Sequence, residues 1–262
     1  MDISIDPVKI SGFEKTFRLL YGFSPRYFKV RGKRNAVLRL GHHKDTSASH
    51  DHLNEFLQSV NIKTGEVFLV RQTHSNKLYL LDDPSRTPSQ TAEVEADAIL
   101  TRLPGKAIGV LTADCIPIIA YDPVRQAVAV AHAGRRGTSQ RILSKTLTAL
   151  INEFGCKPEN ILLGMGPGIG VCCYEVDEPC VQPFREKYAN WNQFVRPLSN
   201  HKFMLDLFAA NQEDSLSVGV WPENIFLAGH CTACENHRFF SYRKEGHTGR
   251  MMTVAMLDSS PK

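Results

Sequence analysis

The stretch that most constrains the fold is residues 109–137, GVLTADCIPIIAYDPVRQAVAVAHAGRRG. β-branched and small apolar residues on both sides of Asp122 predict two core strands joined by a tight turn. If Asp122 faces Arg125 across a type I turn, the same register places Cys115 opposite His132. Directly opposed residues of an antiparallel pair have Cβ atoms about 4.5 to 5.5 Å apart, so this cysteine and histidine could share one metal ion.

A cysteine beside a histidine supports three interpretations: a catalytic dyad, two ligands of a metal site, or a buried thiol packed against a histidine. Two neighbouring features favour a functional site. Asp114 places a carboxylate in an apolar run, where it is costly unless it is paired or functional. His132 is followed by AGRRG, whose small residues and two arginines, Arg135 and Arg136, would let an anion approach the backbone.

A third metal ligand is expected at His74, which lies in RQTHSN beside a predicted turn at Ser75 and Asn76. Two histidines and one thiolate leave one tetrahedral position open, as in a catalytic zinc site rather than a structural one. The spacing along the chain does not by itself bring His74 to Cys115 and His132.

The remaining pattern predicts a single α/β domain over residues 1–262, because no linker, repeat or low-complexity stretch divides the chain. Apolar residues at helical spacing predict a helix over 138–154 that ends near Gly155. Propensity and turn signals predict the other elements: two short strands within 67–81, a loop over 82–95, a strand in 96–102, a strand in 160–176 running into a glycine-rich loop, helices over 178–188 (broken at Pro183) and 205–220, and strands in 224–231, 239–244 and 249–257.

Composition excludes several classes of protein. The chain has seven cysteines, and an odd number in a long chain favours free thiols or metal ligands over a secreted disulfide framework. The N-terminus, MDISIDPVKI, has neither the basic residues nor the apolar run of a signal peptide. No apolar segment reaches the roughly 18 residues that cross a bilayer. We therefore expect a cytoplasmic protein that does not bind a membrane.

Charge also limits the partners. A net charge of +4 suits small anionic ligands but falls short of a nucleic-acid footprint. The one concentrated basic run, RYFKVRGKR at 26–34, is expected to form a solvated strand-and-turn edge. We therefore expect no nucleic-acid partner. The sequence leaves open whether the protein is a monomer or a homodimer.

Six motifs, in this order, resemble the YfiH-type family, also called the laccase-domain or polyphenol oxidase family: RQTHS, EADAILT, LTADCIPIIAYDP, VAVAHAGRRG, GMGPGIGVCCYEV and CTACENHRFFSYRKEGHTGRMMTVAML. YGFS and LRLGHH are similar to the first motifs of that family. The resemblance runs from about Tyr21 to Leu257 and implies a single-domain YfiH-like α/β fold with mixed sheets packed between helices. It also implies zinc, with copper possible, bound by His74, Cys115 and His132.

The activity that the resemblance implies is on purine nucleosides. The expected reaction is phosphorolysis of adenosine, inosine, guanosine and S-methyl-5'-thioadenosine, with deamination of adenosine as a second reaction. A purine nucleoside and inorganic phosphate are therefore the expected partners. For deamination, Asp114 is a candidate acid that protonates the leaving ammonia, beside catalytic Cys115. For phosphorolysis, bound phosphate needs fixed positive charges and a hydroxyl donor, for which the candidates are Arg135, Arg136, Arg243, Arg250 and Ser241.

Other functions stay open. One alternative is a cysteine or zinc amidase that hydrolyses cell-wall precursor peptides. If Cys115 were its nucleophile, the activity would survive metal chelation but would be lost when Cys115 is alkylated. A copper-dependent polyphenol oxidase needs several coppers and many histidine ligands, and the remaining histidines form no series of copper motifs. A binding module would hold metal without turnover.

Three further features receive weaker interpretations. HCTACENH at 230–237 could supply a second set of metal ligands, His230, Cys231, Cys234 and His237, but buried thiols at a strand end are favoured. GMGPGIG lacks the Lys and Ser/Thr of a phosphate-binding P-loop, so a tight turn is favoured. Cys172 and Cys173 receive no role.

Overall fold

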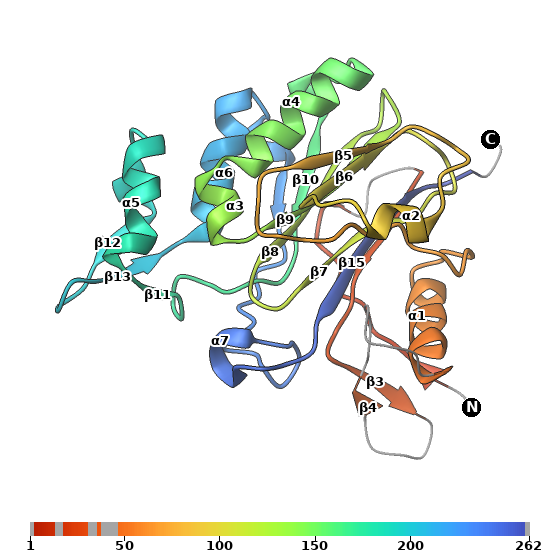
Figure 1. Ribbon diagram of the computed structural model, residues 1–262, viewed down its shortest axis with the longest axis horizontal. Coiled ribbons are helices and arrows are strands. Elements are labelled where there is room, and N and C mark those ends of the chain that lie inside the picture. Colours follow the sequence, from red (N-terminus) through yellow and green to blue (C-terminus); the bar gives the residue numbers. More distant parts are fainter. Residues whose placement is uncertain (1–2, 14–17, 31–35, 38–46, 260–262) are drawn as a thin grey trace.

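The computed structural model describes residues 3–13, 18–30, 36–37 and 47–259 (Figure 1). The motif LRLGHH at 38–43 and residues 31–34 of the basic run lie outside these residues. Arg26, at the start of that run, contacts Glu245 and donates to the carbonyl of Asn236, with 2.9 Å between Nη1 and oxygen. This end of the basic run is therefore part of the packed structure.

A mixed six-stranded sheet forms the centre of the molecule. Its strand order is β14-β10-β8-β9-β6-β5; the outer pairs β10–β14 and β5–β6 are parallel, and the inner pairs are antiparallel. The strands are β5 (Leu78–Leu81), β6 (Ala98–Thr101), β8 (Ile116–Asp122), β9 (Ala127–Ala133), β10 (Leu162–Met165) and β14 (Ile225–Leu227).

Three helices, α3 (Arg135–Ser139), α4 (Ile142–Phe154) and α6 (Leu207–Val218), lie together over one face of this sheet (Figure 1). Alternate residues of β9, all alanines from Ala127 to Ala133, share a buried core with Leu143 and Leu147 of α4. Small side chains on this face let the helix approach the sheet closely.

The opposite face of the six-stranded sheet packs on a second sheet of β2 (Leu19–Phe23), β15 (Met251–Leu257) and β7 (Ile108–Thr112). Val128 and Val130 of β9 face this second core. Because both faces of β9 are buried, the strand contains an unbroken apolar run before His132.

Helix α1 (Ser47–Ser59) covers the outer face of the second sheet, where Phe56 and Leu57 share a core with Val254. The layers are therefore helix, sheet, sheet and helix, which confirms the expected single-domain α/β fold with mixed sheets packed between helices.

The remaining elements surround these layers. They are β1 (Ile3–Ser4), β3 (Tyr27–Val30) and β4 (Ala36–Val37) in one small sheet; β11 (Glu175–Asp177), β13 (Lys202–Leu205) and β12 (Val195–Pro197) in another; the helices α2 (Pro88–Ala92), α5 (Glu178–Lys187) and α7 (Tyr242–Glu245); and the short 3-10 helices η2 (Pro158–Asn160), η3 (Trp191–Gln193) and η4 (Pro222–Asn224). Among the described residues, no helix combines the length and apolar character needed to cross a membrane.

The predicted register of the β8–β9 hairpin is wrong by two residues. Asp122 pairs with Ala127 instead of Arg125, because the turn contains four residues and ends at Gln126, whose φ is 50°. The Asp122 carboxylate accepts hydrogen bonds from the N–H groups of Val124 and Arg125 at 2.8 and 3.0 Å, which stabilises the longer turn.

The error leaves the site intact. Pro117 faces His132, and Cys115 lies directly before β8, next to Gly134. Since successive side chains of a strand alternate between faces, a shift of two residues keeps Cys115 and His132 on the same face.

Several element boundaries also differ from the predictions. The helix expected over 138–154 is two helices, because Arg141 adopts a left-handed conformation with φ of 59° between α3 and α4. Its predicted end at Gly155 is confirmed. The predicted strand at 239–244 is wrong, because the Ser241 side chain accepts a hydrogen bond from the Lys244 N–H and starts helix α7.

Three smaller predictions were also wrong. Within 67–81 only β5 forms a strand, and the preceding residues contribute isolated bridges. The expected loop 82–95 contains α2, which begins with a capping box at Thr87. Helix α5 continues through Pro183, which lies in its second turn.

Candidate metal centre

The candidate site lies at one end of four neighbouring strands of the six-stranded sheet. Asp97 directly precedes β6, Cys115 directly precedes β8, His132 lies near the end of β9, and His74 lies in the loop before β5. Because β9 is antiparallel to β6 and β8, and β5 is parallel to β6, these strand ends lie side by side. The sheet therefore brings together residues that are far apart in the sequence.

The structure groups the three predicted metal ligands. His74, Cys115 and His132 each offer one ligand atom, and these atoms all lie within 4.8 Å of one another. The two imidazole rings are nearly perpendicular, with centroids 4.7 Å apart. His132 is buried, whereas His74 is exposed, so the group opens toward solvent on one side.

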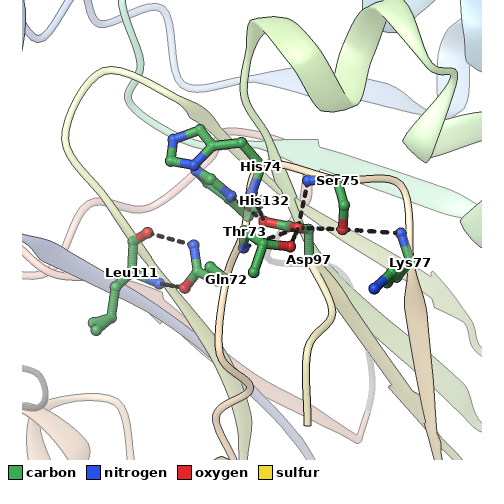
Figure 2. A network of polar contacts seen from close by, with 8 residues as sticks. All are labelled: Gln72, Thr73, His74, Ser75, Lys77, Asp97, Leu111 and His132. Atoms are coloured by element: carbon green, nitrogen blue, oxygen red, sulfur yellow. Dashed lines mark hydrogen bonds and ion pairs between the residues drawn. The ribbon is translucent and has the colours of Figure 1, made fainter.

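Asp97, which the sequence analysis did not select, orients this group (Figure 2). Its Oδ1 lies 2.8 Å from Nδ1 of His132 and accepts the backbone N–H of His74 at 3.0 Å. Its Oδ2 accepts the N–H of Ser75 at 2.6 Å, the hydroxyl of Ser75 at 2.7 Å and the N–H of Thr73 at 3.2 Å. Since a carboxylate accepts, Nδ1 of His132 donates, and Nε2 is left as the ligand atom.

The same contacts shift the protonation of the site. Burial opposes the charge of Asp97, but hydrogen bonds from His132 and Ser75 hold its pKa well below the usual range. Burial also opposes the thiolate of Cys115, yet His132 and His74 lower its pKa to about 6. Despite burial, Cys115 and Asp97 raise the pKa of His132 to about 9. These contacts therefore favour the thiolate form of Cys115.

Two backbone features permit the close grouping. A Cβ added at Gly134 would lie 2.8 Å from Sγ of Cys115 and 3.2 Å from Cδ2 of His74, so only glycine fits there without displacement. His74 has φ of 57°, a left-handed conformation that Asp97 holds through the His74 N–H.

The donor set fits a zinc ion. Zinc accepts imidazole nitrogen and thiolate sulfur, and a catalytic zinc has three protein ligands and one open position. His74, Cys115 and His132 supply two such nitrogens and one sulfur, and a carboxylate lies behind one imidazole as in many zinc sites.

A cavity of about 1040 Å³ adjoins the three ligands. Its lining includes Asp114 and all four predicted arginines: Arg135, Arg136, Arg243 and Arg250. Ser241 is not part of the lining, because its buried side chain caps helix α7. The cavity thus brings together the four arginines expected from the sequence but not Ser241.

The four arginines differ in whether their guanidinium groups already form hydrogen bonds. Nη1 of Arg243 donates to the carbonyl of Glu175 at 2.6 Å. Nη1 of Arg250 donates to the carbonyls of Thr248 and Gly249 at 2.9 and 3.0 Å. In the part of the chain that the structure describes, the guanidinium groups of the other two, Arg135 and Arg136, have no hydrogen bond or ion pair.

Both oxygens of Asp114 are occupied. Oδ1 accepts the hydroxyl of Thr232 and Oδ2 accepts the N–H of Arg243, each at 2.6 Å. The backbone of Asp114 has φ of 88°, and its carbonyl accepts the N–H of Ile169 at 2.8 Å. Asp114 therefore ties the loop before Cys115 to three distant segments.

Three further residues of the cavity were not expected from the sequence. Tyr174 and Tyr242 line the cavity, and Tyr242 is 59% exposed. Gln72 exchanges two 2.8 Å hydrogen bonds with the backbone of Leu111, which fixes the His74 loop beside β7. The motifs RQTHS and CCYEV contain Gln72 and Tyr174, but only the fold shows which residues face the cavity.

Comparison with known proteins adds independent information. Residues 21–258 match the family described as multi-copper polyphenol oxidoreductase laccase. "Adenosine deaminase RL5", from an unknown prokaryotic organism, is 37% identical over 200 residues, covering 74% of this chain and 76% of that protein. A "Purine nucleoside phosphorylase" of Bacteroides thetaiotaomicron is 32% identical over 198 residues, covering 73% of each.

A solved structure supports the same relationship. The hypothetical protein YfiH of Bacillus licheniformis superposes with a TM-score of 0.86 at 26% sequence identity, covering 97% of both chains.

We expect Asp97→Asn to weaken zinc binding about 10- to 100-fold, because the amide cannot accept from all the donors that converge on the carboxylate. Competition with a chromophoric chelator measures the affinity. Glu95→Gln is the matched control, since Glu95 is exposed and pairs with Lys77 outside the site. Equal affinity in Asp97→Asn and the unaltered protein would show that Asp97 does not orient the ligands.

The thiolate of Cys115 predicts a pH profile for the metal-free protein. Alkylation by iodoacetamide requires the thiolate, so the rate at Cys115 should rise with pH and reach half its maximum near pH 6. In the urea-unfolded chain the alkylation rate of the same cysteine should reach half its maximum at about pH 8.5. Peptide mass spectrometry follows the site. Coincident profiles in the two states would contradict the effect of the imidazoles.

Proposed function

This chain belongs to the multi-copper polyphenol oxidoreductase laccase family, as its sequence motifs indicated, and from that premise we propose a cytoplasmic, zinc-dependent purine nucleoside enzyme. The proposed reactions are phosphorolysis of adenosine, inosine, guanosine and S-methyl-5'-thioadenosine, and deamination of adenosine. One observation carries the proposal: His74, Cys115 and His132 form a three-ligand group that opens into an arginine-lined cavity, in which Arg135 and Arg136 have no hydrogen bond or ion pair with any residue that the structure describes.

A bound zinc ion would supply Lewis-acid chemistry and would promote ionisation of water near neutral pH. The chain's own contribution is to hold the donor atoms in place. Asp97 fixes the tautomer of His132 and the backbone of His74, and Gly134 leaves space for the Cys115 sulfur. Copper is the alternative metal, since imidazole and thiolate also bind it.

Phosphorolysis breaks the bond between the purine nitrogen and C1' of the sugar, while a phosphate oxygen bonds to C1'. The phosphate must be held by fixed donors that do not need to leave other partners. Arg135 and Arg136 meet this condition best among the cavity arginines that the structure describes. Arg243 and Arg250, which donate to backbone carbonyls, would add charge at the rim.

Of the two cavity tyrosines, Tyr242 suits the purine better. It is 59% exposed, so a base can stack on its ring, whereas the Arg243 guanidinium lies over the Tyr174 ring, 4.9 Å from its centroid. The contacts of Asp114 favour a positioning role over the acid role expected from the sequence, because both of its oxygens already accept short hydrogen bonds.

A second candidate is a cysteine amidase or hydrolase acting on peptides. The observation that favours it is the chain of contacts from Cys115 through His132 to Asp97, which resembles a nucleophile, base and orienting carboxylate. A polyphenol oxidase has less support, since the ligand group holds only two histidines and one cysteine.

Chromatography of adenosine incubated with the purified protein tests the proposal. With phosphate present, we expect adenine and ribose 1-phosphate; without phosphate, we expect inosine from deamination. Cys115→Ala should lose both activities together with one equivalent of zinc, whereas Cys156→Ala, a change in a buried cysteine outside the site, should keep them.

The outcomes separate the candidates. Activity on nucleosides that is lost on chelation and restored by zinc supports the proposal. A zinc-loaded protein without any nucleoside product would reject it. Amide hydrolysis that survives chelation but stops on alkylation of Cys115 would favour the cysteine hydrolase instead.

The phosphate assignment predicts the effect of one arginine. Arg135→Ala should raise KM for phosphate roughly tenfold or more, because a charge-assisted hydrogen bond contributes about 1.5 to 3 kcal/mol. Deamination of adenosine, which uses no phosphate, should change little. Arg125→Ala is the matched control, since Arg125 is exposed and lies in the hairpin turn at the far end of β8 and β9. An unchanged KM in Arg135→Ala would remove this residue from the phosphate site.

A further inference from the structure

Four cysteines that the candidate metal centre does not use form a second cluster. Cys172 and Cys173 follow β10, and Cys231 and Cys234 follow β14. All four sulfur atoms lie within 4.8 Å of one another. We call this group the four-cysteine cluster.

The sheet explains why these segments meet. β10 and β14 are a parallel pair, so the chain leaves both strands at the same edge. The pairing continues beyond the strands: the Gly168 N–H donates to the carbonyl of His230 at 3.3 Å, and the Thr232 N–H donates to the carbonyl of Gly168 at 2.9 Å. The two cysteine pairs are therefore held together by backbone hydrogen bonds.

Two sulfur separations are close to those of a tetrahedral site. Sγ of Cys234 lies 3.5 Å from Sγ of Cys172 and 3.3 Å from Sγ of Cys173. Zinc–sulfur bonds of about 2.3 Å would place tetrahedral sulfurs about 3.8 Å apart. Small movements of the side chains would therefore let all four sulfurs bind one zinc ion.

A backbone group already donates to one of these sulfurs. The N–H of Gly170 lies 3.2 Å from Sγ of Cys231. Hydrogen bonds of this kind stabilise negative charge on a thiolate ligand. A Cβ at Gly170 would lie 3.2 Å from Sγ of Cys172, so the missing side chain leaves the cluster its space.

We propose that the four-cysteine cluster is a structural tetrathiolate zinc site, separate from the His74, Cys115 and His132 centre. Binding replaces the thiol protons with the metal ion and releases them to solvent, so no oxidant or reductant is needed. Four protein ligands leave no open position, as in structural zinc sites. Exposure of Cys172 and Cys234 gives the ion a path from solvent.

This ligand set differs from the one considered in the sequence. His230 and His237 do not belong to the cluster, and Nδ1 of His230 lies 2.9 Å from the Glu235 carboxylate. Cys172 and Cys173 take their places. Only the C-x-x-C spacing of Cys231 and Cys234 was visible in the sequence.

The four-cysteine cluster would also stabilise the loop that carries Cys115 of the candidate metal centre. Thr232 lies between Cys231 and Cys234, and its hydroxyl donates to Asp114 at 2.6 Å. On the other side, Ile169, shortly before Cys172, donates its N–H to the carbonyl of Asp114 at 2.8 Å. A zinc ion joining the two segments would therefore fix two of the three contacts that position Asp114, the neighbour of Cys115.

Metal content and cobalt spectra test the proposal without any turnover, so the result does not depend on the proposed function. Purified under reducing conditions, the unaltered protein should hold two equivalents of zinc. Cys115→Ala and Cys234→Ser should each hold one, and Cys156→Ala should hold two. Cobalt(II) added to demetallated Cys115→Ala should give the intense visible and charge-transfer bands of a tetrathiolate site, and these should be absent from Cys234→Ser.

Three results would overturn the proposal. One is zinc in the unaltered protein that is lost entirely in Cys115→Ala. Another is the absence of tetrathiolate bands in cobalt-loaded Cys115→Ala, which decides the question even if Cys234→Ser does not fold. The third is a disulfide among the four cysteines in the protein purified without oxidant, seen as the mass loss of two hydrogens.

Discussion

The candidate metal centre depends on one buried carboxylate. Asp97 is fully buried, and a charge in that position is tolerated only because donors from two segments converge on it. Its register partner in the β6–β9 ladder is His132, and the remaining donors come from the loop that carries His74. One side chain therefore fixes both histidines, one through the ring and the other through the backbone. Replacing it would leave several buried donors unpaired at once.

The layered fold supplies the rigid frame for that carboxylate. With both faces of β8 and β9 buried, their side chains alternate between two cores. A shift of β9 by one residue would place its valines in the core filled by its alanines, and its alanines in the core filled by its valines, so packing fixes the register. The chemistry is confined to the strand ends, where the backbone leaves the sheet and polar side chains reach the cavity. Arg135 and Arg136 follow β9 after Gly134, so this arginine-lined side of the cavity is attached to the same strand as His132.

Local pattern was sufficient to predict some features and not others. Cys115 and His132 stood out because an apolar strand needs neither. The error of two residues in the hairpin register did not affect this prediction, because it left both side chains on the same face of the sheet. Asp97 was overlooked because an aspartate before a strand is common in turns, and its role follows only from the β6–β9 pairing. Ser241 was assigned by residue type, although its hydroxyl caps a helix. The four-cysteine cluster was not foreseen because it depends on the parallel pairing of β10 and β14, more than 50 residues apart in the chain.

The order of strands in the central sheet also bears on how the molecule assembles. His74, Cys115 and His132 meet only when β5, β6, β8 and β9 have paired, and contacts between residues so distant in the chain form slowly because their loops cost entropy to close. Cys231 and Cys234 are separated by two residues and can capture a metal ion while the chain is still extended. Both ligand sets are therefore complete only in the folded domain, but assembly of the four-cysteine cluster can begin from a local pair of ligands that holds an ion before β10 and β14 pair.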